Sequence, residues 1–142
     1  MTAGLLFVDD EPENVSLAAE ILAESLKIPV MVADSVERAV ELLHTHRYQA
    51  VIMDLFIPLG DHPDRILGPR ARRYQENVDH LGGLVLLEEI HRLEDPPLII
   101  SHTACTDPVL HELFGDSVVR MIPKPAPLDT LLTTLREALE DA

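Results

Sequence analysis

The segment that decides the fold is Ala50-Val51-Ile52-Met53-Asp54-Leu55-Phe56-Ile57-Pro58, which joins a short apolar run to one carboxylate and a closing proline. An apolar run of this length, rich in Val and Ile, is typical of a strand buried on both faces in a parallel sheet. Burying a carboxylate inside such a strand would carry a large desolvation cost. Asp54 is therefore expected at the carboxyl end of the strand, facing the crevice where ligands bind in open α/β sheets.

Four further apolar runs flank this segment, and amphipathic stretches with helical spacing lie between them. The expected strands are Gly4–Val8, Ile28–Ala33, Ala50–Leu55, Leu98 onward to Thr103, and Val118–Ile122. Five strands alternating with five helices predict an α/β fold with a doubly wound parallel sheet and right-handed crossovers. Pro123 is tolerated only at a sheet edge, which favours the flavodoxin-like strand order 2-1-3-4-5.

Residues 59–81 interrupt this alternation and are expected to be an insertion between the third strand and the third helix, forming a loop or a short helix over residues 71–78. Gly82-Gly83 is then expected to make a turn before that helix. Between Arg65 and Arg73 there are four arginines and no acid. Two interpretations of this segment stay open. It is either a docking or lid element that responds to phosphorylation, or a solvent-exposed surface segment whose arginines pair with the protein's own acids.

The bulk composition indicates one domain over residues 1–142 with an ordinary apolar share of 46%. A formal net charge of −14 disfavours direct binding to nucleic acid or an anionic membrane. Cys105 is the single cysteine, so neither an internal disulfide nor a cysteine-based metal site is expected. With no signal peptide and no apolar run of membrane-spanning length, a reducing cytoplasm is the expected location.

Polar residues close four of the expected strands and should meet at one edge of the sheet. They are Asp9 and Asp10 after the first strand, Asp54 after the third, Thr103 at the end of the fourth and Lys124 after the fifth. Three carboxylates in one crevice repel one another unless a cation joins them, and hard oxygen donors favour Mg²⁺. With a hydroxyl and an ammonium group added, the cluster suits a phosphoryl group, with Asp54 as the carboxylate nucleophile.

These residues stand in motifs that resemble the receiver domains of two-component response regulators. The motifs are Phe7-Val8-Asp9-Asp10-Glu11, residues 52–58, Thr103-Ala104 and Ile122-Pro123-Lys124-Pro125. The resemblance implies phosphoryl transfer from a histidine kinase or phosphotransfer protein onto Asp54, assisted by Thr103 and Lys124. It implies Mg²⁺ held by Asp9, Asp10, Asp54 and the backbone carbonyl of Phe56. It also implies self-catalysed phosphorylation and slow dephosphorylation rather than turnover of a separate substrate, with output to a downstream protein partner that the sequence does not name.

Three features depart from the family's pattern. Met121 replaces the aromatic residue that the family couples to the Thr103 position, which puts the usual conformational switch in doubt, although Met can fill the same gap. Phe56 and Cys105 flank the path of hydrolytic water in the family, and apolar side chains there predict a long-lived phosphoryl group. The third departure is the insertion, which leaves the chain directly after Pro58.

Competing interpretations are a receiver-like interaction scaffold that phosphorylation does not switch, and a phosphatase of the haloacid-dehalogenase type. The phosphatase would need a second Asp where Phe56 stands. A dinucleotide-binding fold is disfavoured because no Gly-rich turn follows the first strand. Dimerisation through the fourth helix, fifth strand and fifth helix remains an alternative that the sequence does not decide.

Overall fold

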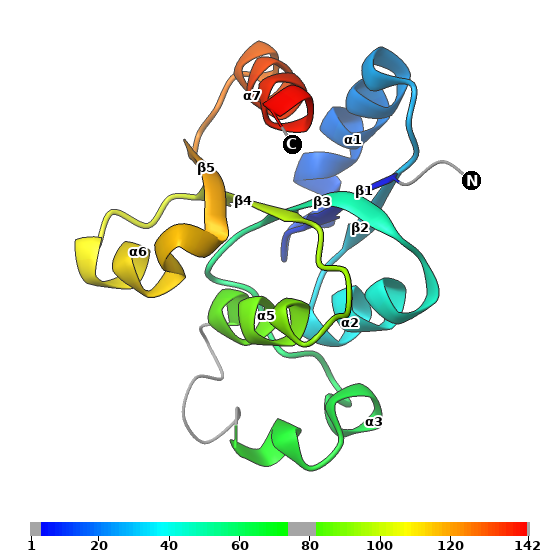
Figure 1. Cartoon of the computed structure of the whole chain (residues 1–142), viewed down its shortest axis with the longest axis vertical. Coiled ribbons are helices and arrows are strands. Elements are labelled where there is room, and N and C mark those ends of the chain that lie inside the picture. Colours follow the sequence, from blue (N-terminus) through cyan, green and yellow to red (C-terminus); the bar gives the residue numbers. More distant parts are fainter. Residues whose placement is uncertain (1–3, 74–81, 142) are drawn as a thin grey trace.

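The five expected strands form one parallel sheet in the computed structural model, which describes residues 4–73 and 82–141 (Figure 1). The strands are β1 (Gly4–Val8), β2 (Val30–Ala33), β3 (Tyr48–Met53), β4 (Leu98–Thr103) and β5 (Val118–Pro123). Their order is β2-β1-β3-β4-β5, as predicted. The strand β5 lies at an edge and pairs with one neighbour only, so the missing backbone N–H of Pro123 is tolerated there.

Burial explains why β1 and β3 lie near the centre of the sheet. Every residue of β1 is buried, and in β3 only Gln49 is partly exposed. The two strands pair in register from Leu5 with Ala50 to Val8 with Met53, so both end at the same level. The residues that follow, Asp9 and Asp54, are therefore carried to one edge of the sheet.

Helices cover both faces of the sheet (Figure 1). On one face α1 (Pro12–Leu26) and α7 (Leu128–Asp141) pack over a core that contains Leu5, Phe7 and Ile52. On the other face α2 (Val36–Thr45) and α5 (Gly82–His91) pack over Leu6, Val51 and Met53. The short α6 (Pro108–Phe114), followed by the 3₁₀ turn η1 (Gly115–Ser117), lies at the β5 end of the sheet.

Side-chain caps begin two of these helices. The Ser35 hydroxyl accepts a hydrogen bond from the Arg38 amide at 3.1 Å, and the Asp107 carboxylate accepts one from the Val109 amide at 2.9 Å. These caps satisfy amides that have no partner within the first helical turn. None of the helices in residues 4–73 and 82–141 is long and apolar enough to cross a membrane.

The described part of the inserted segment is folded against the domain. It contains α3 (Asp64–Leu67), and residues 70–73 are helical as well. Leu59, Leu67 and Ala71 are at most 5% exposed and belong to the same apolar core as the buried residues of α2 and α5. The rest of the helix expected over residues 71–78 lies outside the described residues. The inserted segment is thus a further layer over α2, held by apolar burial.

The turn expected at Gly82-Gly83 is wrong, because both glycines belong to the first turn of α5 and both are buried. Glycine in a helix is unfavourable by about 1 kcal/mol relative to alanine, which is why the pair looked like a helix breaker. The close approach of another backbone segment explains why glycine is present there, as shown below.

Candidate functional site

Asp9, Asp54 and Lys124 come together at the carboxyl edge of the sheet, as the sequence predicts. The Lys124 Nζ atom donates to Asp9 Oδ2 at 2.7 Å and to Asp54 Oδ2 at 2.8 Å. Both carboxylates are buried, and the lysine backbone is fixed by a hydrogen bond from its amide to the Thr103 carbonyl at 3.0 Å. One ammonium group therefore bridges acids that follow two different strands.

The second oxygen of each carboxylate is held by the backbone that follows it. The Phe56 amide donates to Asp54 Oδ1 at 3.2 Å, and the Glu11 amide donates to Asp9 Oδ1 at 2.9 Å. Each carboxylate thus has one oxygen on Lys124 and one on a local amide. This arrangement fixes both side chains and leaves further lone pairs of their oxygens available.

The charges of the cluster shift its pKa values in opposite directions. Burial alone would raise the pKa of Asp54, but hydrogen bonds from Lys124 and Thr103 lower it overall, which keeps the carboxylate ionised at neutral pH. Burial would lower the pKa of Lys124, but its bonds to Asp54 and Asp9 raise it. Although Asp10 is exposed, partial loss of solvent around its carboxyl group raises its pKa, and the charges of Asp9, Asp54 and Glu11 raise it further. The site thus carries more negative charge than Lys124 compensates.

Thr103 ends β4 and is 3% exposed. Its hydroxyl oxygen accepts a hydrogen bond from the Cys105 amide at 3.2 Å. The hydrogen bond between this hydroxyl and Asp54 contributes to the lowered pKa of that carboxyl group. Lys124 therefore contacts three other predicted site residues: Asp9 and Asp54 through its ammonium group, and Thr103 through its backbone amide.

The fit of this site to Mg²⁺ rests on its donor chemistry. Carboxylate oxygens and a backbone carbonyl are ligands that Mg²⁺ prefers, and the uncompensated negative charge favours a second cation. Among the described residues, no three His, Cys, Asp or Glu side chains are arranged to surround a metal ion in this conformation. Asp10, which is exposed, would complete the predicted ligand set together with Asp9 and Asp54.

A cleft of about 440 Å³ opens beside the cluster. Asp54, Lys124 and Phe56 line it together with apolar residues from α1 and α7. The Phe56 side chain is 42% exposed, so a large apolar group stands at the mouth of the site. A group that enters this cleft can therefore contact both Asp54 and the aromatic ring of Phe56.

His102 also lines this cleft, although its place in the sequence does not predict a role at the site. Its ring is buried and packs edge-to-face on Phe7, with 5.7 Å between ring centroids. Burial lowers its pKa, so the imidazole is neutral at physiological pH. The alternation of side chains along β4 was the available signal, because it places His102 on the face opposite Thr103.

The arginines of the inserted segment do not gather at this site. The Arg70 guanidinium binds the Glu89 carboxylate through Nε at 3.1 Å and Nη2 at 2.7 Å. Arg73 pairs with Glu88 at 3.2 Å, and Arg92 also pairs with Glu89. For Arg70 and Arg73, the interpretation that these arginines pair with the protein's own acids is confirmed.

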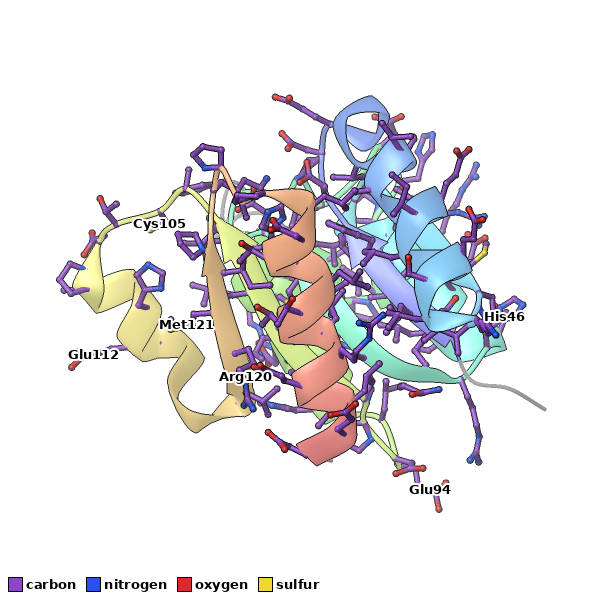
Figure 2. All side chains as sticks on the ribbon, turned by 90° about the horizontal axis from the view of Figure 1, so that it is seen from above. His46, Glu94, Cys105, Glu112, Arg120 and Met121 are labelled. Carbon is purple, nitrogen blue, oxygen red and sulfur yellow. The ribbon has the colours of Figure 1, made fainter. Side chains whose placement is uncertain are left out.

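Two of the positions that depart from the receiver pattern, Met121 and Cys105, are not among the residues that line the cleft beside Asp54. Met121 is 51% exposed on β5, in register with Ser101 rather than with Thr103. Figure 2 shows Met121 beside the β5 ribbon, and Cys105 on the connection from β4 to α6. The Met121 side chain thus points outward in this conformation and does not fill space behind Thr103.

The fold is that of response-regulator receiver domains. A CheY-like receiver domain protein from Methanospirillum hungatei superposes with a TM-score of 0.75 at 17% identity, covering 99% of this chain and 96% of that one. The receiver domain of RstA from Klebsiella pneumoniae gives 0.68 at 22% identity, with 96% and 97% covered. The chemotaxis response regulator CheY4 of Vibrio cholerae gives 0.70 at 18% identity, with 96% and 98% covered. No protein-family model matches the chain, and neither does the sequence of any curated protein.

Proposed function

We propose that this chain is a phospho-acceptor domain, in which Asp54 receives a phosphoryl group from a histidine kinase or a phosphotransfer protein. One observation carries the proposal. The buried Asp54 carboxylate is held at the carboxyl edge of the sheet by Lys124 and the Phe56 amide, and it lines an open cleft. The receiver fold supports the same conclusion. Output would follow from altered contacts with a downstream protein.

The transfer needs an ionised carboxylate, and the lowered pKa of Asp54 supplies one. An Asp54 oxygen attacks the phosphorus of the donor's phosphohistidine. The new P–O bond forms as the P–N bond breaks, and the donor imidazole leaves with the bonding electron pair and takes up a proton. Lys124 pairs with a phosphoryl oxygen and the Thr103 hydroxyl donates to another, so catalysis consists mainly of positioning and charge stabilisation.

Asp9, Asp10, Asp54 and the backbone carbonyl of Phe56 would hold Mg²⁺. When bound, the ion would neutralise negative charge on the phosphoryl oxygens. The donor set and the raised pKa of Asp10 support this assignment, because both indicate a place for a further positive charge. The role of the protein is to hold these oxygens and the Lys124 ammonium group together around Asp54.

The test is labelling with acetyl phosphate and Mg²⁺, followed by the mass of the intact protein. We expect one phosphoryl group per chain, lost in Asp54→Asn and on chelation of Mg²⁺. The exposed Asp61→Asn, in the inserted segment, serves as the matched control and should label normally. A wild-type chain that takes up no phosphate would instead indicate an interaction scaffold. Unchanged labelling of Asp54→Asn would place the phosphoryl group elsewhere.

A further inference from the structure

We propose that Gly82 and Gly83, the first residues of α5, are positioning residues for the site around Asp54. They set the orientation of the backbone over Leu55–Ile57, which contains the Phe56 carbonyl assigned above to Mg²⁺. The inference rests on the proposed function, because it concerns how that same site is held. Nothing in the receiver motifs at the strand ends points to these residues.

The contacts are backbone hydrogen bonds from the start of α5. The Gly83 amide donates to the Leu55 carbonyl at 2.9 Å, and the Gly82 amide donates to the Ile57 carbonyl at 3.0 Å. The Phe56 amide donates to Asp54 at 3.2 Å. Peptide groups on both sides of Phe56 are thus fixed from outside the loop, so the direction of the Phe56 carbonyl between them is determined as well.

The close approach of the two segments explains why both positions are glycine. A Cβ atom on Gly83 would lie 2.6 Å from the Asp54 carbonyl oxygen and 2.6 Å from Leu55 Cα. A Cβ atom on Gly82 would lie 2.0 Å from the Ile57 carbonyl oxygen. In each case the obstacle is backbone, so any side chain would displace the loop. The helix start tolerates two residues that each disfavour helix by about 1 kcal/mol, and this close approach is the reason.

The segment after Asp54 cannot easily move away from α5, because its far end is hydrogen-bonded to the start of α2. The Val36 amide donates to the Pro58 carbonyl at 2.9 Å, and the Glu37 amide donates to the Leu59 carbonyl at 2.8 Å. The segment after Asp54 is therefore clamped between the amino ends of α2 and α5. A methyl group added at Gly83 must push Asp54 and Leu55 away from α5, against the fixed end at Pro58.

The first experiment compares Gly83→Ala with His91→Ala, the control at the exposed end of the same helix. Titration calorimetry measures Mg²⁺ affinity, and intact mass measures the rate of labelling by acetyl phosphate at saturating Mg²⁺. We expect Gly83→Ala to lose roughly tenfold in both, because a misplacement of about 1 Å can cost up to about a hundredfold. His91→Ala should match the wild type. A folded Gly83→Ala chain with wild-type affinity and rate would overturn the inference.

A second measurement uses the wild-type chain, so a variant that does not fold leaves the test intact. On addition of Mg²⁺ and then beryllofluoride, the amide resonances of Gly82 and Gly83 should shift, while Gly68, which has no Cβ contact with the loop, should not. If Mg²⁺ binds and the wild type is labelled but neither glycine amide moves, the positioning role is wrong. If the wild type neither binds Mg²⁺ nor accepts a phosphoryl group, the proposed function fails, and this inference fails with it.

Discussion

The ion pair between Arg70 and Glu89 offers the sharpest test of how the inserted segment is attached. The Glu89 side chain is 3% exposed and lies on α5, whereas Arg70 lies in the inserted segment and is 35% exposed. The two are joined by two hydrogen bonds, at 2.7 and 3.1 Å. The perturbation is a double-mutant cycle from Arg70→Ala and Glu89→Ala.

The magnitude follows from this burial and from the second partner of Glu89. Removing one member of a buried ion pair costs about 3–5 kcal/mol in unfolding free energy. Arg92 lies 3.3 Å from Glu89 in the wild-type chain, so in the Arg70→Ala variant it should still neutralise part of the buried negative charge of Glu89. We therefore expect Arg70→Ala to destabilise by about 2 kcal/mol, with a coupling energy to Glu89 of about 1.5–3 kcal/mol, the range for hydrogen bonds to charged groups.

The assay is urea unfolding monitored by circular dichroism. The matched control is the Arg38–Glu41 pair on α2, in which both side chains are about half exposed. Its coupling energy should be below about 1 kcal/mol. Raising NaCl to about 1 M, where the Debye length falls to about 3 Å, should abolish the control coupling and leave most of the Arg70–Glu89 coupling.

Equal coupling energies for the two pairs, or equal salt sensitivity, would refute this reasoning. That outcome would mean that Glu89 is hydrated in solution and that burial of Leu67 and Ala71 alone holds the segment to the domain. A smaller urea dependence in Arg70→Ala, with stability otherwise kept, would indicate partial detachment of the segment before global unfolding.

Four further predictions concern the site and the helix beside it. Phe56→Asn should shorten the lifetime of the phosphorylated protein, because a polar side chain can orient water where the phenyl ring now stands; loss of phosphate from the wild type within seconds would contradict this. Lys124→Met should lower stability by about 3 kcal/mol at neutral pH, because it leaves two buried carboxylates unpaired, and added Mg²⁺ should restore part of it. The pKa of Asp54 is lowered from 3.8 on folding, so ionised Asp54 stabilises the folded chain above about pH 4, and this contribution is lost as pH falls through the folded pKa. Acid titration of Lys124→Met should therefore show a smaller loss of unfolding free energy over that range than the wild type. Ser35→Ala should cost about 1 kcal/mol in thermal unfolding through loss of the α2 cap, whereas an unchanged melting temperature would show that the cap contributes nothing.

The strand order was predictable because the apolar runs, the crossovers and Pro123 each restrict the same topology. The inserted segment was not, because its core contacts come from few residues, such as Leu67 and Ala71, too sparse to give a period. Gly82-Gly83 was misassigned for a related reason. The conformation of this pair depends on its contact with the backbone of residues 54–57, and helix propensity, which depends on local sequence, does not include such a contact.

The site residues were predictable to the extent that parallel strands bring their carboxyl ends together. The sequence could place Asp9, Asp54, Thr103 and Lys124 at one edge, but not the bridging position of the lysine between two carboxylates. The presence of His102 at the cleft depends on the pleat of β4, which a count of residues indicates only when the strand's exact start is known.

The half-exposed phenyl ring of Phe56 has a spectroscopic consequence. The chain contains no tryptophan, so it lacks a strong intrinsic fluorophore. An indole introduced as Phe56→Trp would emit without background from another tryptophan, in the lining of the cleft and two residues from the proposed phospho-acceptor Asp54. Its emission would report binding at the carboxylates in real time, so the same aromatic position that narrows access to Asp54 is also the place to observe events there.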